Sequence, residues 1–267
     1  VVDLDLGGPN LHKHLGIIRP KHSLSHFING KKTDLNEMVE SLPDTTMGII
    51  SGASDHLEVA NLKHFQKQKI IRHLSKLSAD YVILDLGAGT TYNTLDFFNH
   101  ADQGILSVIP EPTSIENSHR FLKCAMYRKL RDVPADTKQL VKEMLSMPAH
   151  ETKELNTLHK IISSIHKKSP RHGTILKAKV ASSGLHLIVN QVRDPADFQL
   201  GYSMALVWKK FYGKKPDSLS FLNHDTSIIK ALCERKKYLL ENPHSRNSVQ
   251  IKHLIKTISQ KESHGAT

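Results

Sequence analysis

The chain has 267 residues, a length within the range of a single α/β domain, and 39% of them are hydrophobic. Its two cysteines stand alone and no apolar run approaches the roughly 20 residues of a membrane span. These features argue against a disulfide framework, a structural zinc site, an iron–sulfur scaffold and a transmembrane helix, and favour a reduced, cytoplasmic setting. The formal net charge of +11 is compatible with an acidic partner, although most of the basic residues are typical of a solvated surface.

Short apolar runs alternate along the chain with longer helical patterns. The expected strands are residues 1–5, 47–51, 81–86, 104–109, 185–192 and 218–223. The expected helices lie near residues 60–77, 94–100, 114–131, 137–147, 151–167, 195–212, 227–234 and 248–260. This alternation predicts an α/β fold of three layers, α/β/α, in which helices cover both faces of a mostly parallel sheet. We expect one domain over residues 1–267, with 248–267 as its C-terminal helix and frayed tail.

Two local patterns make narrower predictions. Thr113 can cap a helix and Glu116 can reach back to it, a capping box directly after the strand at 104–109. The segment HKKSPRHGTILKAKVASSG, residues 166–184, is polar and contains proline and glycine. It is interpreted as a loop or as an excursion at the edge of the sheet, and the pattern does not decide between the two.

Two of the expected strands end in an aspartate that glycines follow. Asp5 precedes Gly-Gly-Pro-Asn, and Asp85 precedes Gly87-Ala88-Gly89. Ligands of open parallel sheets collect at the carboxyl ends of strands, and small residues let backbone amides approach a phosphate. One such site alone is more typical of a turn or a helix cap, but two in one sheet favour a binding site.

Four motifs occur in the order DLDLGGPNLHKHLGI, DLGAGT, VIPEPTSIENSHRF and LIVNQVRD. Together they resemble the successive motifs of the MinD/ParA group of P-loop ATPases, which carry a deviant Walker A loop. The resemblance is closest to MinD-like proteins, including the flagellar-number regulators of the FlhG type, and runs from Val1 to about Arg246. It implies a P-loop NTPase-like fold, ATP and Mg²⁺ as cofactors of the complete protein, and ATP hydrolysis.

The resemblance assigns roles to five residues around the phosphates. Asp5 matches the switch I aspartate that orients the attacking water, and Asp3 matches a supporting acid near the magnesium ion. Asn10 matches a switch I polar residue near the γ-phosphate. Asp85 matches the Walker B aspartate, which holds Mg²⁺ through water, and Gly89 matches the switch II glycine that senses the γ-phosphate. Positioned water, metal and neutralised charge are what phosphoryl transfer requires.

Three further residues match the part of the family's site that borders the nucleoside. Asn190 stands where the family contacts the adenine edge, and a buried Asn offers both a donor and an acceptor for that contact. Without the resemblance, an Asn at a strand end is as often bonded to local backbone. Pro110 and Glu111 begin a segment that also borders the nucleotide.

The sequence departs from the family at its defining motif, because GxxxxGK[ST] occurs nowhere in it. We expect that the first strand, the P-loop and the first helix of the family are missing, either by truncation or by natural loss. The chain as written should then bind ATP poorly and hydrolyse almost none of it. It should also expose the sheet position that the first strand fills in relatives, which favours aggregation.

The resemblance implies a regulatory switch that dimerises with ATP, engages a surface or a protein activator, and is released by hydrolysis. Such switches organise the division site, flagellar number or cargo position. Two alternatives stay open: a non-catalytic interaction module, or a basic ParA-like protein that binds DNA and has lost nucleotide binding. The absence of CxxC argues against an Mrp-like iron–sulfur carrier.

The last helical pattern leaves a further choice. The apolar residues Val249, Ile251, Leu254, Ile255 and Ile258 form an imperfect stripe, with Lys252 and Lys256 between them. The pattern predicts a helix that closes the domain more readily than an amphipathic helix that lies on anionic lipid at the inner membrane.

Overall fold

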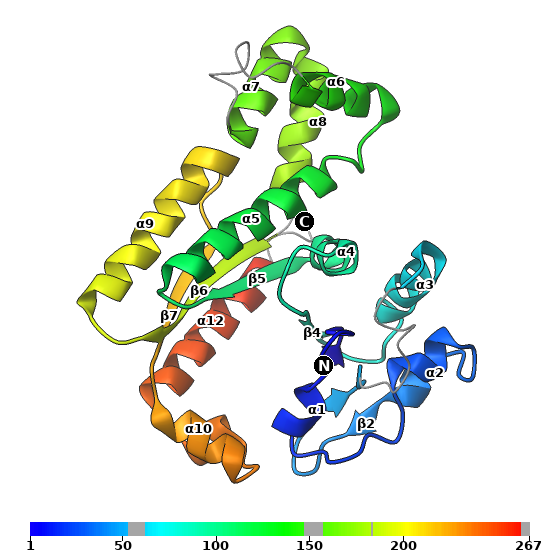
Figure 1. Cartoon of the computed structure of the whole chain (residues 1–267), viewed down its shortest axis with the longest axis vertical. Helices are drawn as coiled ribbons and strands as arrows, with labels where there is room; N and C mark the ends of the chain where they lie inside the picture. The colour runs from blue at the N-terminus through cyan, green and yellow to red at the C-terminus, as the bar shows by residue number, and fades with distance from the viewer. Residues whose placement is uncertain (53–61, 147–156, 183, 263–267) are drawn as a thin grey trace. The chain divides into compact units, whose positions relative to one another are not determined.

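The computed structural model describes residues 1–52, 62–146, 157–182 and 184–262 (Figure 1). By their contacts they form two compact units, which we describe separately. Unit 1 consists of Val1–Ala101 and Thr226–Asn242, and unit 2 of Asp102–Asp225 and Pro243–Thr267. The expectation of a single domain stays a prediction.

Unit 1 is built on a pair of short parallel strands, β1 (Val2–Asp3) and β4 (Leu84–Asp85). A second pair, β2 (Glu40–Ser41) and β3 (Gly48–Ile49), is antiparallel, and Val2 also bridges to Ile50. The helices are α1 (Leu11–His14), α2 (Leu24–Ile28), the 3₁₀ helix η1 (Asn36–Met38), α3 (His64–Leu74), α4 (Tyr92–His100), α10 (Thr226–Cys233) and α11 (Tyr238–Glu241). The core cluster includes Val2, Leu24, Phe27, Ile50, Ile70 and Phe97.

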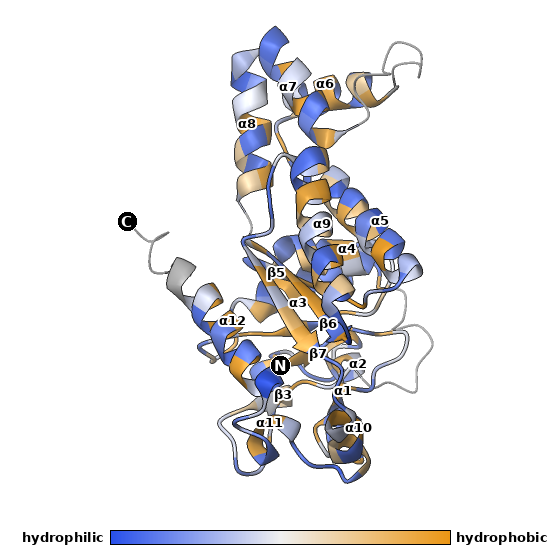
Figure 2. Ribbon diagram, turned by 90° about the vertical axis from the view of Figure 1, so that its left-hand side faces the viewer, coloured by the Kyte–Doolittle hydropathy of each residue, from blue (hydrophilic) through white to orange (hydrophobic). Residues whose placement is uncertain are grey.

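Unit 2 contains a parallel sheet of β5 (Gln103–Val108), β6 (Gly184–Val192) and β7 (Ser218–Asn223), in the order β5-β6-β7. Its helices are α5 (Pro112–Lys129), α6 (Ala135–Ser146), α7 (Leu158–Lys168), α8 (Pro170–Ala181), α9 (Pro195–Tyr212) and α12 (Arg246–Glu262). Helices α5 and α9 cover one face of the sheet and α12 the other (Figure 2). The buried imidazole of His186 joins the three strands, because its ring nitrogens lie 2.7 Å from Ser218 Oγ and 2.9 Å from Gln103 Oε1.

The structure confirms an α/β fold with parallel strands. Each of the six expected strands overlaps an observed one, although three of those observed, β1, β3 and β4, are only two residues long. Residues 60–61, 147 and 151–156 of the expected helices lie outside the described residues. In the described part of the chain, no helix is both long and apolar enough to cross a bilayer.

The prediction of a loop or sheet-edge excursion at residues 166–184 was wrong. Most of this segment is helix α8, which begins at Pro170. Proline is favoured in the first turn of a helix, because the N–H groups of that turn have no hydrogen-bond partner within the helix and the missing one costs nothing. The helix packs against α7 through Gly173, where a Cβ atom would come within 2.3 Å of the His166 Cβ. The two residues that suggested irregular structure therefore start the helix and permit its close packing.

The predicted capping box at Thr113 and Glu116 was also wrong. Helix α5 begins at Pro112, so its N-cap is Glu111, whose side chain makes no capping bond. Glu116 lies one turn into the helix, where Oε1 accepts from Arg120. Proline at the first helical position moved the start of the helix ahead of the expected cap.

The C-terminal helix α12 packs on the sheet of unit 2, as the interpretation of its pattern as a domain-closing helix predicted. Leu254 is buried, and α12 contacts β7. Asn247 Oδ1 accepts from Asn223 N at 2.7 Å, and Asn247 Nδ2 donates to Asn223 O at 2.9 Å.

Replacing an apolar residue at a sheet edge by lysine should reduce self-association of the chain. Strand β5 pairs with β6 alone among the described residues, and its Ile105 is 46% exposed. An edge strand with exposed apolar side chains templates pairing with another chain, and a charge there blocks it. We expect Ile105→Lys to lower the associated fraction in sedimentation velocity roughly several-fold. The matched control is Ile18→Lys, which is exposed but lies in no strand; an equal effect of both variants would contradict the prediction.

Candidate functional site

The three predicted acids meet at the carboxyl ends of the parallel strands of unit 1. In the register of β1 and β4, Asp3 stands opposite Asp85, and Leu4 N donates to Asp85 O at 2.8 Å. Asp3 is fully buried: its Oδ1 accepts from Asp5 N and its Oδ2 from Leu11 N, both at 3.2 Å. Asp3 therefore fixes the chain that carries Asp5.

Two glycines make room for these carboxyl groups. A Cβ atom at Gly87, directly after β4, would lie 2.6 Å from Asp5 Oδ1, so Asp5 rests against the turn that follows Asp85. A Cβ atom at Gly52 would lie 2.5 Å from Asp3 O and 3.2 Å from Asp3 Oδ1. Gly52 was missed by sequence reasoning, and its only signal is its place just after the strand at 47–51. Only glycine permits these close approaches without a shift of the neighbour.

Burial, together with the charges of neighbouring carboxyl groups, disfavours the ionisation of Asp3 and of Asp85. Burial raises the pKa of Asp3 to about 6; hydrogen bonds from the Leu11 and Asp5 N–H groups oppose this, and the charges of Asp85 and Asp5 add to it. Burial and the charge of Asp5 raise the pKa of Asp85, while His14 opposes the shift. A divalent cation nearby would relieve this repulsion, because carboxylate oxygens are its preferred ligands.

A magnesium ion held through water fits these residues. Across the described ranges, no three His, Cys, Asp or Glu side chains are arranged to bind a metal ion directly. Asp85 at the strand end is half-buried and can contact the water shell of an ion. Magnesium usually keeps several of its waters in proteins, so a directly coordinating cage is not required.

Replacing Asp3 by Asn should flatten the dependence of stability on pH. Because the pKa of Asp3 is raised to about 6 in the folded state, the folded protein binds more protons than the unfolded chain between about pH 4 and 6. Its contribution to stability is therefore present below about pH 4 and is lost as the pH rises through about 6, by up to about 3 kcal/mol.

Urea midpoints of the parent protein and of Asp3→Asn, measured from pH 4 to 8, test this. The midpoint of the parent should change with pH, and that of Asp3→Asn should change less. Asp34→Asn is the control, since hydrogen bonds from Asn36 lower the pKa of the partly exposed Asp34 carboxyl, which predicts the opposite slope. An unchanged pH profile for Asp3→Asn would contradict the assignment.

Asn10 and Gly89 lie on exposed segments that follow the same two strands. Asn10 is the N-cap of α1, and its carbonyl accepts from Lys13 N at 2.9 Å. Gly89 has a φ of +102°, a conformation that residues with a side chain rarely adopt, and nothing lies within 4 Å of its missing Cβ. Both residues can thus face a ligand beyond the strand tips of unit 1.

The remaining predicted residues belong to unit 2, at the carboxyl ends of β5 and β6. Pro110 and Glu111 follow β5, while Asn190 follows Val189, which pairs with Val108. Asn190 Oδ1 accepts from Gln191 N at 2.9 Å, and Gln191 has a φ of +58° at an irregularity of the ladder. Such bulges re-aim side chains and are frequent next to functional sites. The structure thus brings Asp3, Asp5 and Asp85 together in unit 1, and Pro110, Glu111 and Asn190 at one sheet edge in unit 2.

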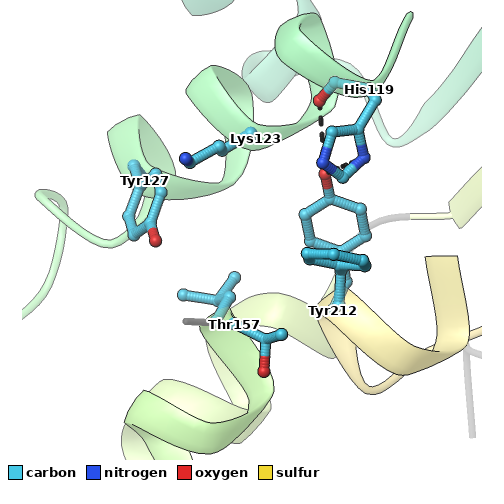
Figure 3. Close-up of a pocket in the computed structure, with 7 residues that line it drawn as sticks. His119, Lys123, Tyr127, Thr157 and Tyr212 are labelled. Atoms are coloured by element: carbon cyan, nitrogen blue, oxygen red, sulfur yellow. Dashed lines mark hydrogen bonds between the residues drawn. The ribbon is translucent and has the colours of Figure 1, made fainter. Parts of the chain in front are cut away.

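A small cavity in unit 2 lies outside the predicted site (Figure 3). Its volume is about 30 Å³, and it is lined by α5, the start of α7 and the end of α9, through His119, Lys123, Tyr127, Thr157, Leu158, Phe211 and Tyr212. Tyr212 points at His119 and its hydroxyl donates to His119 O at 3.2 Å. Burial lowers the pKa of His119 and raises the pKa of Tyr212. A space of this size suits water rather than a nucleotide.

Comparison with curated proteins gives two distant relatives, and no protein-family model matches the chain. The chain is 29% identical over 125 residues to the antiactivator FleN of Pseudomonas aeruginosa, which is 46% of this chain and 44% of FleN. It is 28% identical over 123 residues to the septum site-determining protein MinD of Buchnera aphidicola, covering 46% of this chain and 45% of that protein. The matches thus span less than half the length of either relative.

Solved structures match nearly the whole chain at low identity. The cell division ATPase MinD of Pyrococcus furiosus matches with a TM-score of 0.58 and 14% identity, over 97% of this chain and 84% of that one. A ParA family ATPase from Chlorobium tepidum gives 0.59 and 16%, over 94% and 81%. A chain of the MinC:MinD cell division protein complex of Aquifex aeolicus gives 0.54 and 13%, over 98% and 82%. The chain has the fold of these ATPases and is a distant relative of the MinD/ParA/FleN P-loop ATPases, as its motifs predicted.

Proposed function

We propose that this chain carries the switch and Walker B parts of a MinD-like ATPase, which uses ATP to control dimerisation in the spatial organisation of the cell. The observation that supports this most is the parallel pairing of β1 and β4, which gathers Asp3, Asp5 and Asp85 at one edge. Asp5 orients the attacking water, and Asp3 holds Asp5 in place. Asp85 would hold a magnesium ion through water, and such an ion would supply positive charge against the phosphates.

The other predicted residues keep their proposed roles within each unit, taken separately. Asn10 and Gly89 respond to the γ-phosphate from exposed segments of unit 1. Asn190 contacts the adenine edge, with Pro110 and Glu111 bordering it. The proposed partners are a second copy of the chain and a protein activator, in a cytoplasmic setting or at the inner membrane surface. The likeness to a chain of the MinC:MinD cell division protein complex supports a protein partner.

A grafted chain tests the proposal. The first strand, the GxxxxGK[ST] loop and the first helix of a MinD relative are joined to Val1. Amides of the loop, its lysine and its Ser/Thr supply the triphosphate contacts that carboxylates cannot. We expect this chimera to bind ATP with Mg²⁺ at micromolar Kd and to dimerise with ATP, whereas the chain as written binds ATP much more weakly.

Control variants separate the role of the grafted segment from that of the carboxylates of this chain. Asp85→Asn in the chimera should weaken the dependence of ATP binding on Mg²⁺, while Asp44→Asn, an exposed carboxylate of unit 1, should leave it unchanged. Micromolar binding by the chain as written would contradict the expectation drawn from its sequence. A folded chimera that stays monomeric at saturating ATP would favour the non-catalytic interaction module.

A further inference from the structure

The small cavity of unit 2 is lined by side chains that donate hydrogen bonds. His119, Lys123 and Tyr127 follow one another at intervals of four residues along α5, so they share one face of that helix. Figure 3 shows Lys123 and Tyr127 on one side of the cavity, with His119 and Tyr212 on the other. Lys123 is exposed and Tyr127 is half-buried, so the cavity reaches the surface on their side.

Burial sets the protonation of these side chains. It raises the pKa of Tyr127, and together with the neighbouring Tyr127 and Cys124 it raises the pKa of Tyr212. Burial first, and then the charge of Lys123, lowers the pKa of His119. Near neutral pH both phenols are therefore O–H donors and the imidazole is uncharged. Among the described residues that line the cavity, Lys123 is then the one cation, and none is acidic.

Two of these donors have no acceptor in the part of the chain that the structure describes. The Tyr212 hydroxyl donates to His119 O at 3.2 Å. The Tyr127 hydroxyl makes no such bond, and the Lys123 amino group takes part in no ion pair but lies 6.0 Å from the centre of the Tyr127 ring. An acceptor in the cavity would satisfy both donors, and a negatively charged one would do so most strongly.

The size of the cavity restricts what such an acceptor can be. A water needs about 10–15 Å³ of this kind of space, so about 30 Å³ holds two or three waters. The carbon and two oxygens of a carboxylate group occupy similar room. Leu158 and Phe211 add an apolar wall that suits a short hydrocarbon tail. Inorganic phosphate is larger and carries more charge than one lysine balances.

We propose that this cavity binds the carboxylate group of a small organic acid, with one oxygen accepting from Lys123 Nζ and the other from the Tyr127 hydroxyl. The site lies wholly within unit 2, apart from the acids of unit 1, and does not depend on the proposed nucleotide function. A ligand there contacts α5, the start of α7 and the end of α9 at once. Binding should therefore stabilise the packing of these three helices.

Titration of the full chain with sodium acetate, followed by ¹H–¹⁵N correlation spectra at constant ionic strength, tests the proposal. We expect saturable shifts of the amide signals of residues 119–127, 157–158 and 211–212, with a Kd on the order of 1 mM. Lys123→Met keeps the length of the side chain without its charge and should raise the Kd at least fivefold. Tyr127→Phe removes only the hydroxyl and should raise the Kd roughly threefold.

The matched control is Lys177→Met, which removes an exposed lysine of unit 2 that does not line the cavity and should change the Kd less than about twofold. Methylammonium chloride and sodium phosphate form two further arms, and neither should give saturable shifts at these residues. Three results would overturn the proposal: no saturable shift with acetate, equal Kd values for Lys123→Met and the parent, or equal shifts with methylammonium. Tighter binding of phosphate than of acetate would overturn the assignment to a carboxylate.

Discussion

Replacing Lys67 by methionine is expected to lower the free energy of unfolding by about 3–5 kcal/mol. Lys67 lies on the buried face of α3 with Ile70 and Leu74, and its ammonium group is paired with Asp96 of α4. The Lys67 side chain is 5% exposed and that of Asp96 is 18% exposed. Removing the lysine takes a positive charge away from a carboxylate that is mostly shielded from water, which is the costly outcome.

A double variant without either charge separates the effect of the pair from the packing of its side chains. Lys67→Met/Asp96→Leu removes both charges and should recover most of the lost stability, since apolar replacements of a buried pair are often neutral. The exposed pair Lys32–Glu37 is the control, and Lys32→Met there should cost less than about 1 kcal/mol. Chemical unfolding monitored by circular dichroism measures all four proteins. Equal costs for Lys67→Met and Lys32→Met would show that burial of the pair does not matter.

Replacing Asp5 by Asn in the grafted chimera is expected to lower kcat for ATP hydrolysis roughly 10²–10³-fold, with little change in ATP affinity. The amide keeps the size of the carboxylate against Gly87 but loses its charge. A residue that orients the attacking water acts in the transition state, so kcat should fall while binding stays.

Two further variants locate the effect in the position of the Asp5 carboxylate. Gly87→Ala adds a methyl group 2.6 Å from Asp5 Oδ1 and should also lower kcat, because it displaces the carboxylate without changing its charge. Asp34→Asn removes a partly exposed carboxylate of the same unit and should leave hydrolysis unchanged. An unchanged kcat in Asp5→Asn would show that the Asp5 carboxylate does not orient the attacking water.

The sequence was most informative where one physical signal dominates. The apolar runs predicted β5, β6 and β7 to within one residue at each end. Helix α9 was predicted with its observed bounds, because Asp194 caps its start through Ala196 N and Asp197 N, and Gly213 ends it with a φ of +77°. The meeting of Asp5 and Asp85 at one edge followed from two strands that each end in acid.

Long-range packing accounts for what the sequence did not predict. Gly173 in α8 is typical of irregular structure in the sequence, but in the fold it allows His166 of α7 to pack directly against the helix. Gly52 lies 49 positions from Asp3 in the sequence, so nothing local indicates that it makes room for that carboxyl group. The buried Lys67 breaks the apolar pattern of α3 and is explained only by Asp96 on another helix.

The most direct test is a crystal structure of the grafted chimera with Mg²⁺ and a non-hydrolysable ATP analogue. The account predicts that Asp85 contacts the water shell of the metal and that Asp5 faces the water next to the γ-phosphate. A γ-phosphate and metal bound away from the tips of β1 and β4, with Asp5 and Asp85 facing only solvent, would contradict it.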